Sequence, residues 1–197
     1  MDNYLKYYWL ETEYLEKEVY ADFHAKGFLT EEQFFAIIFW KSKRPAKKWI
    51  RPNLPDAASV KHLTAKLYEA KEYDKKLETL LLQKGFNIAM ASGILTILYP
   101  DIFTVYDYRL RDQINKYLES AHKPLVADLS AITDIEKKKK LYWSYVSSVR
   151  EVYPDLSLRN SDRVLWAKSW YEYLKDFLAD KTEEDGSVEK SGLVFRE

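Results

Sequence analysis

The sequence predicts an all-α protein, and three observations support that prediction. Apolar residues recur at spacings of three and four along most of the chain, as on one face of a helix. Only five Gly and six Pro occur in 197 residues, too few for the frequent tight turns of a sandwich or barrel. Hydrophobic residues make up 47% of the chain, enough for one sizeable core. We therefore expect a single helical domain over residues 1–179 and a polar, flexible tail over 180–197.

The first forty residues predict an amphipathic segment followed by a buried helix. Residues 3–25 place tyrosine, leucine and valine at helical spacings among acidic residues, and Gly27 ends that segment. Thr30 and Gln33 form a capping-box pattern that leads into the apolar run 34–40. We therefore expect a helix to begin directly after Thr30.

A basic stretch follows at residues 41–51. Pro45 and Pro52 interrupt any continuous helix there, which predicts a basic loop. Trp40 and Trp49 add aromatic rings, so the loop could hold phosphates and stack a base. A solvated connection is the equal alternative. The cations are Lys41, Lys43, Arg44, Lys47, Lys48 and Arg51.

The remaining elements are predicted from periodicity and from start and stop residues. Asp56 after Pro55 is a suitable N-cap, Gly85 separates two helices, and Pro100 ends another. Residues 120–132 lack periodicity and predict a loop. The expected helices span residues 56–73, 74–82, 88–99, 107–118, 134–152 and 161–178.

Charge is unevenly distributed, although the formal net charge is zero. Residues 1–40 contain three cations and eight anions, whereas residues 41–84 contain twelve cations and five anions. Such asymmetry indicates a local anionic partner. The chain has no signal-peptide pattern and no apolar run long enough for a membrane span. We therefore expect a soluble protein without a membrane partner.

No cofactor and no metal are expected. The chain contains no cysteine, which excludes thiolate zinc sites, cysteine-ligated iron–sulfur clusters and a cysteine nucleophile. None of the histidines, His24, His62 and His122, has a carboxylate or a second histidine at a metal-binding spacing. The absence of cysteine fits a reducing, cytoplasmic location.

Residues 82–91 form the predicted joint between two helices. Gly85 can adopt the positive φ that turns the chain, and Asn87 tolerates a left-handed conformation better than most residues. Free backbone N–H groups at the start of the next helix suit a phosphate. From the residues alone, a helical hairpin that serves only packing is the alternative. The predicted DNA-binding residues are Lys84, Gly85, Phe86 and Asn87 of the joint and Lys41, Lys43, Arg44, Lys47 and Lys48 of the basic loop.

The order of these motifs resembles the helix-hairpin-helix DNA glycosylase superfamily, which includes endonuclease III and 8-oxoguanine glycosylase. The family has an apolar-x-x-Gly-apolar-Gly-x-x-x-Ala hairpin, followed later by an aspartate at the start of a helix. The matching residues here are Leu82, Gly85, Phe86, Ala91 and Asp107, with Asn87 in place of the second glycine. Residues 39–44 and 158–166 also resemble sequence segments of uncharacterised family relatives.

The resemblance spans residues 28–178 and implies a fold and a partner. It implies a two-lobed helical body with a cleft, the hairpin on one side and Asp107 at the floor. Double-stranded DNA is the implied partner and DNA repair the implied process, with a monomer favoured.

Two departures from the family pattern limit the implied chemistry. Family members that also nick the DNA backbone carry a lysine just after the hairpin, where its amine forms a Schiff base. Ile88 and Ala89 occupy those positions here, and Lys84 precedes the turn. We therefore predict no lyase activity of that kind. Asn87 also adds a side chain where the backbone should come nearest the phosphate.

Asp107 is the predicted catalytic residue. Release of a base passes through a cation-like sugar, so a nearby carboxylate would stabilise positive charge and orient or deprotonate a water. The N-terminus of a helix would favour the ionised form. The alternative is that Asp107 is simply an N-cap, worth about 1 kcal/mol, and the two roles are compatible.

Four aromatic residues are candidates to line a pocket for a base flipped out of the duplex: Trp40, Tyr106, Tyr108 and Trp166. Core packing is the alternative for each. Asp162 and Arg163 are expected to form a structural ion pair at a helix start.

The predicted function is that of a monofunctional DNA glycosylase, a hydrolase that cleaves the N-glycosidic bond of a damaged base through Asp107. Two alternatives remain open. One is a non-catalytic DNA-binding protein on the same scaffold, and the other is a helical protein-interaction module.

Overall fold

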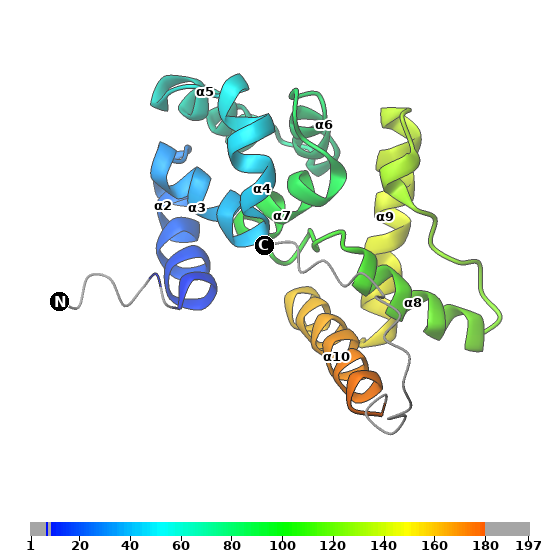
Figure 1. Ribbon diagram of the computed structural model, residues 1–197. Coiled ribbons are helices and arrows are strands. Elements are labelled where there is room, and N and C mark those ends of the chain that lie inside the picture. The colour runs from blue at the N-terminus through cyan, green and yellow to red at the C-terminus, as the bar shows by residue number, and fades with distance from the viewer. Residues whose placement is uncertain (1–6, 8, 180–197) are drawn as a thin grey trace.

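The computed structural model describes residue 7 and residues 9–179, and within them it contains helices and connections but no strand (Figure 1). The all-α prediction is therefore confirmed for these residues. Residues 1–6, 8 and 180–197, which include the predicted tail, lie outside the described residues. The elements are η2 (Leu10–Val19), α2 (Tyr20–Lys26), α3 (Glu31–Lys41), α4 (Lys43–Pro45), η3 (Ala46–Ile50), η4 (Arg51–Asn53), α5 (Ala57–Glu69), α6 (Tyr73–Leu81), α7 (Ile88–Leu98), α8 (Tyr108–Ser120), η5 (Leu129–Ala131), α9 (Ile135–Val152) and α10 (Leu158–Ala179).

Side-chain caps fix the predicted starts of α3 and α5. The Gln33 amide donates to Thr30 Oγ1 at 3.2 Å, and the Thr30 amide donates to Gln33 Oε1 at 3.0 Å. Asp56 forms the same reciprocal arrangement with Ser59 before α5. Each cap of this kind contributes about 1 kcal/mol, so these two starts are set by local sequence.

Several elements differ from the prediction, among them η5, a short helical turn inside the predicted loop 120–132. The basic stretch is not a loop but a series of short helical turns, α4, η3 and η4. Its prolines are compatible with these turns, because Pro45 closes α4 and Pro52 lies in the first residues of η4. α10 begins at Leu158, earlier than the predicted Ser161.

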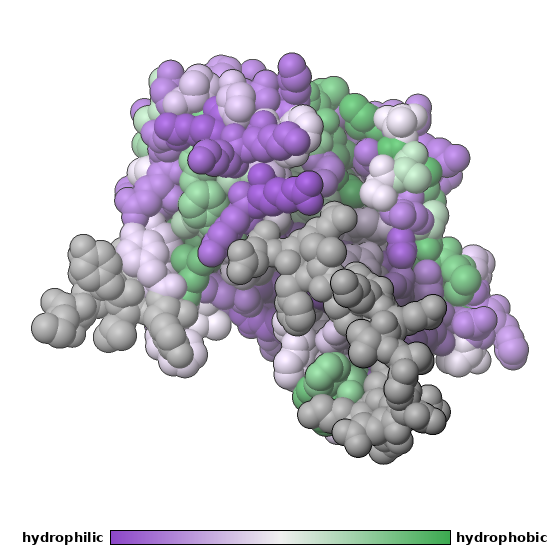
Figure 2. Space-filling model, in the orientation of Figure 1, coloured by the Kyte–Doolittle hydropathy of each residue, from purple (hydrophilic) through white to green (hydrophobic). Residues whose placement is uncertain are grey.

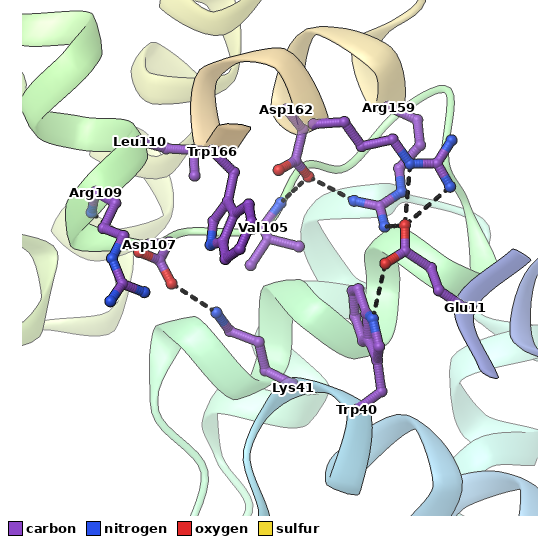
Figure 3. Close-up of a pocket in the computed structure, with 11 residues that line it drawn as sticks. Glu11, Trp40, Lys41, Val105, Asp107, Arg109, Leu110, Arg159, Asp162 and Trp166 are labelled. Carbon is purple, nitrogen blue, oxygen red and sulfur yellow. Dashed lines mark hydrogen bonds and ion pairs between the residues drawn. The ribbon is translucent and has the colours of Figure 1, made fainter. Parts of the chain in front are cut away.

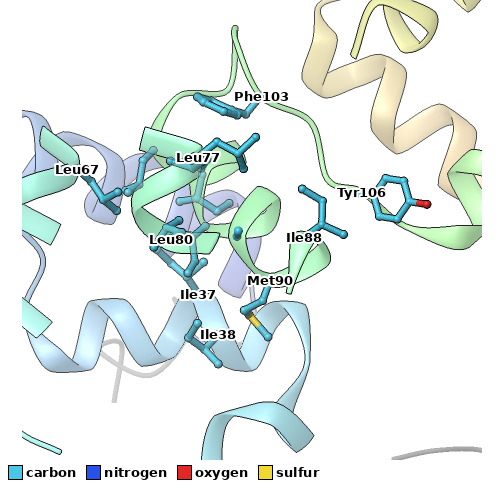
Figure 4. Packing of buried hydrophobic residues seen from close by; sticks show 14 of the residues in the cluster. Ile37, Ile38, Leu67, Leu77, Leu80, Ile88, Met90, Phe103 and Tyr106 are labelled. Atoms are coloured by element: carbon cyan, nitrogen blue, oxygen red, sulfur yellow. The ribbon is translucent and has the colours of Figure 1, made fainter. Parts of the chain in front are cut away.

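Helix α7 is the centre of the hydrophobic core. It packs against η2, α2, α3 and α6, and all of its residues except Ala89 are buried. Figure 4 shows side chains from α3, α6 and α7 meeting there, among them Ile37, Leu80 and Met90. A helix that is apolar on every side must be enclosed. The chain then passes to α8, α9 and α10, which pack against one another (Figure 1).

The turn between α6 and α7 requires Gly85. Its φ is +93°, and a Cβ built on it would lie 2.4 Å from the Trp49 carbonyl oxygen. A side chain is therefore excluded both by backbone conformation and by the close approach of η3.

Asn87 does not adopt the left-handed conformation that the sequence allowed. Its φ of −111° and ψ of 174° are extended, and it is the N-cap of α7. Its Oδ1 accepts a hydrogen bond from the Met90 amide at 2.9 Å. The side chain thus occupies one of the first-turn amides that a phosphate would otherwise use.

Among the described residues, no helix has both the length and the apolar character that crossing a membrane requires.

Gly85→Ala should lower the free energy of unfolding by at least about 1–2 kcal/mol, because the left-handed conformation alone costs that much for a residue with a Cβ. Urea unfolding measures the loss. Lys84→Ala, at the exposed neighbouring position, is the control and should stay within about 0.5 kcal/mol of wild type. Equal stability of the two variants would contradict the close approach of η3 to the turn.

Candidate functional site

The last part of the connection between α7 and α8, residues 103–107, is held by side chains from neighbouring helices. Ser92 of α7 accepts a hydrogen bond from the Tyr106 amide at 2.8 Å. Tyr142 of α9 donates its hydroxyl hydrogen to the Thr104 carbonyl at 2.7 Å, and its oxygen accepts from the Thr104 amide at 3.2 Å.

Val105 is held in the same way. Tyr145 of α9 donates to its carbonyl at 2.7 Å, and Asp162 of α10 accepts from its amide at 3.3 Å. Buried backbone groups require partners, and here they are supplied by three helices. Asp107, at the end of the segment, is thereby fixed in space.

Asp107 is bonded through both carboxylate oxygens. Oδ1 accepts from the Arg109 amide at 2.9 Å, which makes Asp107 the N-cap of α8. Oδ2 accepts from Lys41 Nζ at 2.9 Å. Lys41 passes beside Gly93 of α7, where an added Cβ would lie 3.2 Å from Lys41 Cγ. The glycine gives the lysine room to reach the carboxylate.

The pKa of Asp107 is lowered. Burial raises it, since only 16% of the side chain is exposed, but the charge and hydrogen bond of Lys41 and the Arg109 amide together outweigh burial. The carboxylate is therefore ionised at neutral pH. Its contribution to stability is complete above the ordinary pKa of 3.8 and is lost as the pH falls through the lower, folded value.

A cavity of about 400 Å³ is lined by Asp107 and by side chains from several helices (Figure 3). Trp40 and Lys41 come from the end of α3, and Trp166 comes from α10. In Figure 3 these two helices approach the cavity from opposite sides. A carboxylate, an ammonium and two indole rings therefore share one space large enough for a small planar molecule.

Glu11 joins three elements at the edge of the cavity. Its carboxylate accepts from Trp40 Nε1 at 3.0 Å, Arg159 Nη2 at 2.6 Å and Arg163 Nε at 2.9 Å. Glu16 accepts from both arginines as well. Burial raises the pKa of Glu11, but the two arginines and Trp40 lower it by more. η2, α3 and α10 are thus linked by charge-assisted hydrogen bonds.

Asp162 lies behind this network and is buried. It accepts from Arg159 Nη1 at 2.9 Å in addition to the Val105 amide. Its pKa is raised, because burial outweighs the lowering by these partners. The expected ion pair with Arg163 does not form. Arg159, one helical turn earlier, faces Asp162, whereas Arg163 turns to Glu11.

Comparison with protein-family models, with characterised proteins and with solved structures finds no match for this chain. The function of the cavity therefore has to be inferred from its own geometry and chemistry.

Only two of the four predicted pocket aromatics line the cavity, Trp40 and Trp166. Tyr106 is buried with its ring 5.2 Å from that of Tyr145, and its oxygen accepts from the Leu129 amide at 2.8 Å. Tyr108 is exposed outside the cavity.

Alternation along the backbone explains the position of Tyr106. Val105 and Asp107 both line the cavity, and successive side chains of a non-helical segment point to opposite sides. Tyr106 therefore points into the core. Tyr108 begins α8 and is directed by the helix instead.

The predicted DNA-binding cations separate into two groups. Lys41 is only 15% exposed and is directed at Asp107. The other five, Lys43, Arg44, Lys47, Lys48 and Lys84, are exposed. Figure 2 shows mainly hydrophilic side chains over α3 to α5 in this view.

The turn between α6 and α7 adjoins the basic turns, α4, η3 and η4, through the Gly85 contact with Trp49. Lys84, Gly85 and Asn87 are exposed. Phe86 is half-buried, with its ring 6.4 Å from that of Phe34. The turn and the basic segment therefore present one continuous surface.

Another cavity, of about 800 Å³, lies on the outer side of α3 and is lined mainly by apolar groups such as Phe35 and Phe39. Its Arg51 is paired with Glu31. Only Lys47 of the predicted site residues lines it, so the cavity at Asp107 is the candidate site.

Several residues at the site were not predicted to be there. Glu11 and Arg159 meet across 148 positions of sequence, and Lys41 meets Asp107 across 66. Arg159 lies in segment 158–166, whose resemblance to the glycosylase family was the one feature of the sequence that drew attention to this residue. Within residues 7 and 9–179, no three acidic or histidine side chains are grouped so that they could hold a metal ion.

Lys41→Met should raise the pKa of Asp107 above its wild-type value, because the lysine is the largest influence opposing burial. Carbon-detected NMR of the carboxyl groups during a pH titration measures the shift. Lys43→Met, which removes an exposed lysine of the next helical turn, should leave the Asp107 pKa unchanged. An equal pKa in wild type and Lys41→Met would contradict the ion pair.

Proposed function

We propose that this chain is a monofunctional DNA glycosylase, which hydrolyses the bond between a damaged base and deoxyribose. In this proposal the helices form a two-lobed body with a cleft, and α6, the turn and α7 are a helix-hairpin-helix motif. The observation that supports it is the Asp107 carboxylate, ionised and facing a cavity between Trp40 and Trp166.

The chemistry requires a carboxylate that keeps its charge in a partly dehydrated place. Loss of the base leaves positive charge on the sugar, and a fixed anion nearby stabilises that transition state. Lys41 and the first turn of α8 keep Asp107 ionised before substrate binds. As the sugar becomes cationic, it competes with Lys41 for Oδ2, and the carboxylate can hold the attacking water.

The two indole rings supply the surfaces that a planar base requires. A base extracted from a duplex loses its stacking neighbours and regains part of that energy against aromatic side chains. Trp40 is fixed by its hydrogen bond to Glu11, and the Arg159 guanidinium lies 5.3 Å from its ring. The ring is therefore held in place before the base arrives, with Arg159 over one of its faces.

The DNA backbone would lie on the surface formed by the hairpin turn and the basic turns. Asn87 uses one amide of the first turn of α7, so fewer amides remain for a phosphate. The exposed cations of residues 43–48 then provide most of the attraction, which should weaken steeply with salt.

Strand nicking through a Schiff base is not part of the proposal. No amine stands at Ile88 or Ala89. Lys41 does reach the cavity, but its nitrogen is ion-paired with Asp107, and an ammonium is not a nucleophile.

One observation favours a second candidate, a DNA-binding protein without chemistry on the same scaffold. Both oxygens of Asp107 already have partners within the chain, as expected of a residue whose only tasks are to cap α8 and to pair with Lys41. This candidate predicts salt-sensitive DNA binding and no abasic product on any substrate.

Asp107→Asn separates the two candidates, because asparagine caps a helix about as well as aspartate but carries no charge. We expect base release from a panel of damaged duplexes to fall by roughly a hundredfold or more, while DNA binding persists. Gel analysis of abasic sites measures release, and borohydride should trap no protein–DNA adduct.

Asp112→Asn is the matched control, since Asp112 is exposed on the same helix and should release bases at the wild-type rate. Wild-type release by Asp107→Asn would remove Asp107 from the mechanism. Binding without release by the wild-type protein would favour the non-catalytic candidate.

A further inference from the structure

Helix α10 carries exposed aromatic side chains beyond the part that lines the cavity. Trp166, Trp170 and Tyr173 are 44%, 51% and 47% exposed. Figure 2 shows apolar and near-neutral residues at the surface over the end of this helix. Large aromatic groups left at the surface in a row usually mark a binding site.

The three rings lie in one line along the helix. With 3.6 residues per turn, positions 166, 170 and 173 fall within about 60° of one another around the axis and extend over about 10 Å. Arg159 and Arg163, which border the cavity, fall on the same side of α10. The line of rings therefore begins in the cavity, at Trp166, and runs away from it.

We infer that Trp166, Trp170 and Tyr173 form a stacking platform for unpaired nucleotides next to the base held in the cavity. The inference rests on the proposed function in that the cavity holds a nucleobase. Bases of a single strand stack on successive aromatic side chains whatever their sequence, because every base has a π face. Because the row of rings starts at a cavity large enough for a base, it would extend base stacking from the cavity to the neighbouring nucleotides.

One cation, Arg109, stands where the line of rings begins. α8 packs against α10 and presents Arg109 at the cavity. The Arg109 guanidinium lies 5.2 Å from the Tyr108 ring. Lys116 of α8 is paired with Glu172 of α10, which is rotated by about 100° from Tyr173 and so lies off the line of rings. A phosphate at the start of the row would therefore meet the Arg109 guanidinium.

The chain offers a matched control on the same helix. Tyr171 is 56% exposed but is rotated by about 100° from the nearest ring of the platform. Tyr171 tests whether every exposed ring on α10 contributes to nucleotide binding or only the rings that lie in line with the cavity.

The experiment measures binding of a fluorescein-labelled oligothymidylate by fluorescence anisotropy at low salt. Trp170→Ala and Tyr173→Ala should each weaken binding by roughly five- to one-hundredfold, as loss of one stacked base predicts. Tyr171→Ala should stay within about twofold of wild type, the usual range for a surface substitution. Trp170→Phe should retain most of the affinity.

Two results would overturn the inference. One is equal binding by wild type and the Trp170→Ala, Tyr173→Ala double variant. The other is a wild-type dimer, seen by sedimentation, that the double variant dissociates, which would assign the rings to contact between two copies of the chain.

Asp107→Asn distinguishes failure of the platform from failure of the proposed function. Base release should be lost in this variant, whereas Trp170→Ala should weaken oligothymidylate binding by the same factor in the Asp107→Asn background as in wild type. If base release depends on Asp107 but oligothymidylate binding is unaffected by loss of the rings, the platform is contradicted and the proposed function is not. If oligothymidylate binding depends on the rings but the wild-type protein releases no base, the hydrolase is contradicted and the platform is not.

Discussion

The buried segment between α7 and α8 needs partners for its backbone, and that need organises the site. Ser92, Tyr142, Tyr145 and Asp162 supply hydrogen bonds to five amide and carbonyl groups of residues 104–106. An unpaired buried group would cost about 1–3 kcal/mol. Helices α7, α9 and α10 must therefore converge on this segment. Their convergence places Asp107, the next residue along the chain, at the cavity.

The same convergence determines what the cavity can hold. Its charged side chains are largely paired with one another, Lys41 with Asp107 and Arg159 with Glu11 and Asp162. Little net charge remains for a strongly ionic ligand, whereas two indole faces and several polar atoms suit an uncharged planar one. A nucleobase fits that description, and the phosphates it carries along would be met outside, at the basic turns. In the proposed function, the cavity would contact the base and the cationic surface would contact the phosphates.

The features that could be predicted from the sequence depend on residues close together in the chain, whereas the main contacts that were missed depend on residues far apart. The starts of α3, α5 and α8 were predictable because Thr30 meets Gln33 three residues away and Asp107 meets Arg109 two away. The Lys41–Asp107 pair joins residues 66 apart and depends on how α3 crosses α7. Tyr106 was misplaced because its direction follows from the non-helical backbone before α8, which composition does not reveal. Asn87 was expected to turn the chain, and it caps α7 because Gly85 already supplies the turn.

In the proposed function, Asp107 faces the position where positive charge develops on the sugar. The most direct test is the affinity for a duplex that carries a cationic pyrrolidine in place of one deoxyribose, compared with a neutral tetrahydrofuran at the same position. A mimic of the transition-state charge should bind wild type at least about tenfold more tightly than the neutral analogue, and Asp107→Asn should lose that preference. Equal affinities of the wild-type protein for the two duplexes would contradict the account.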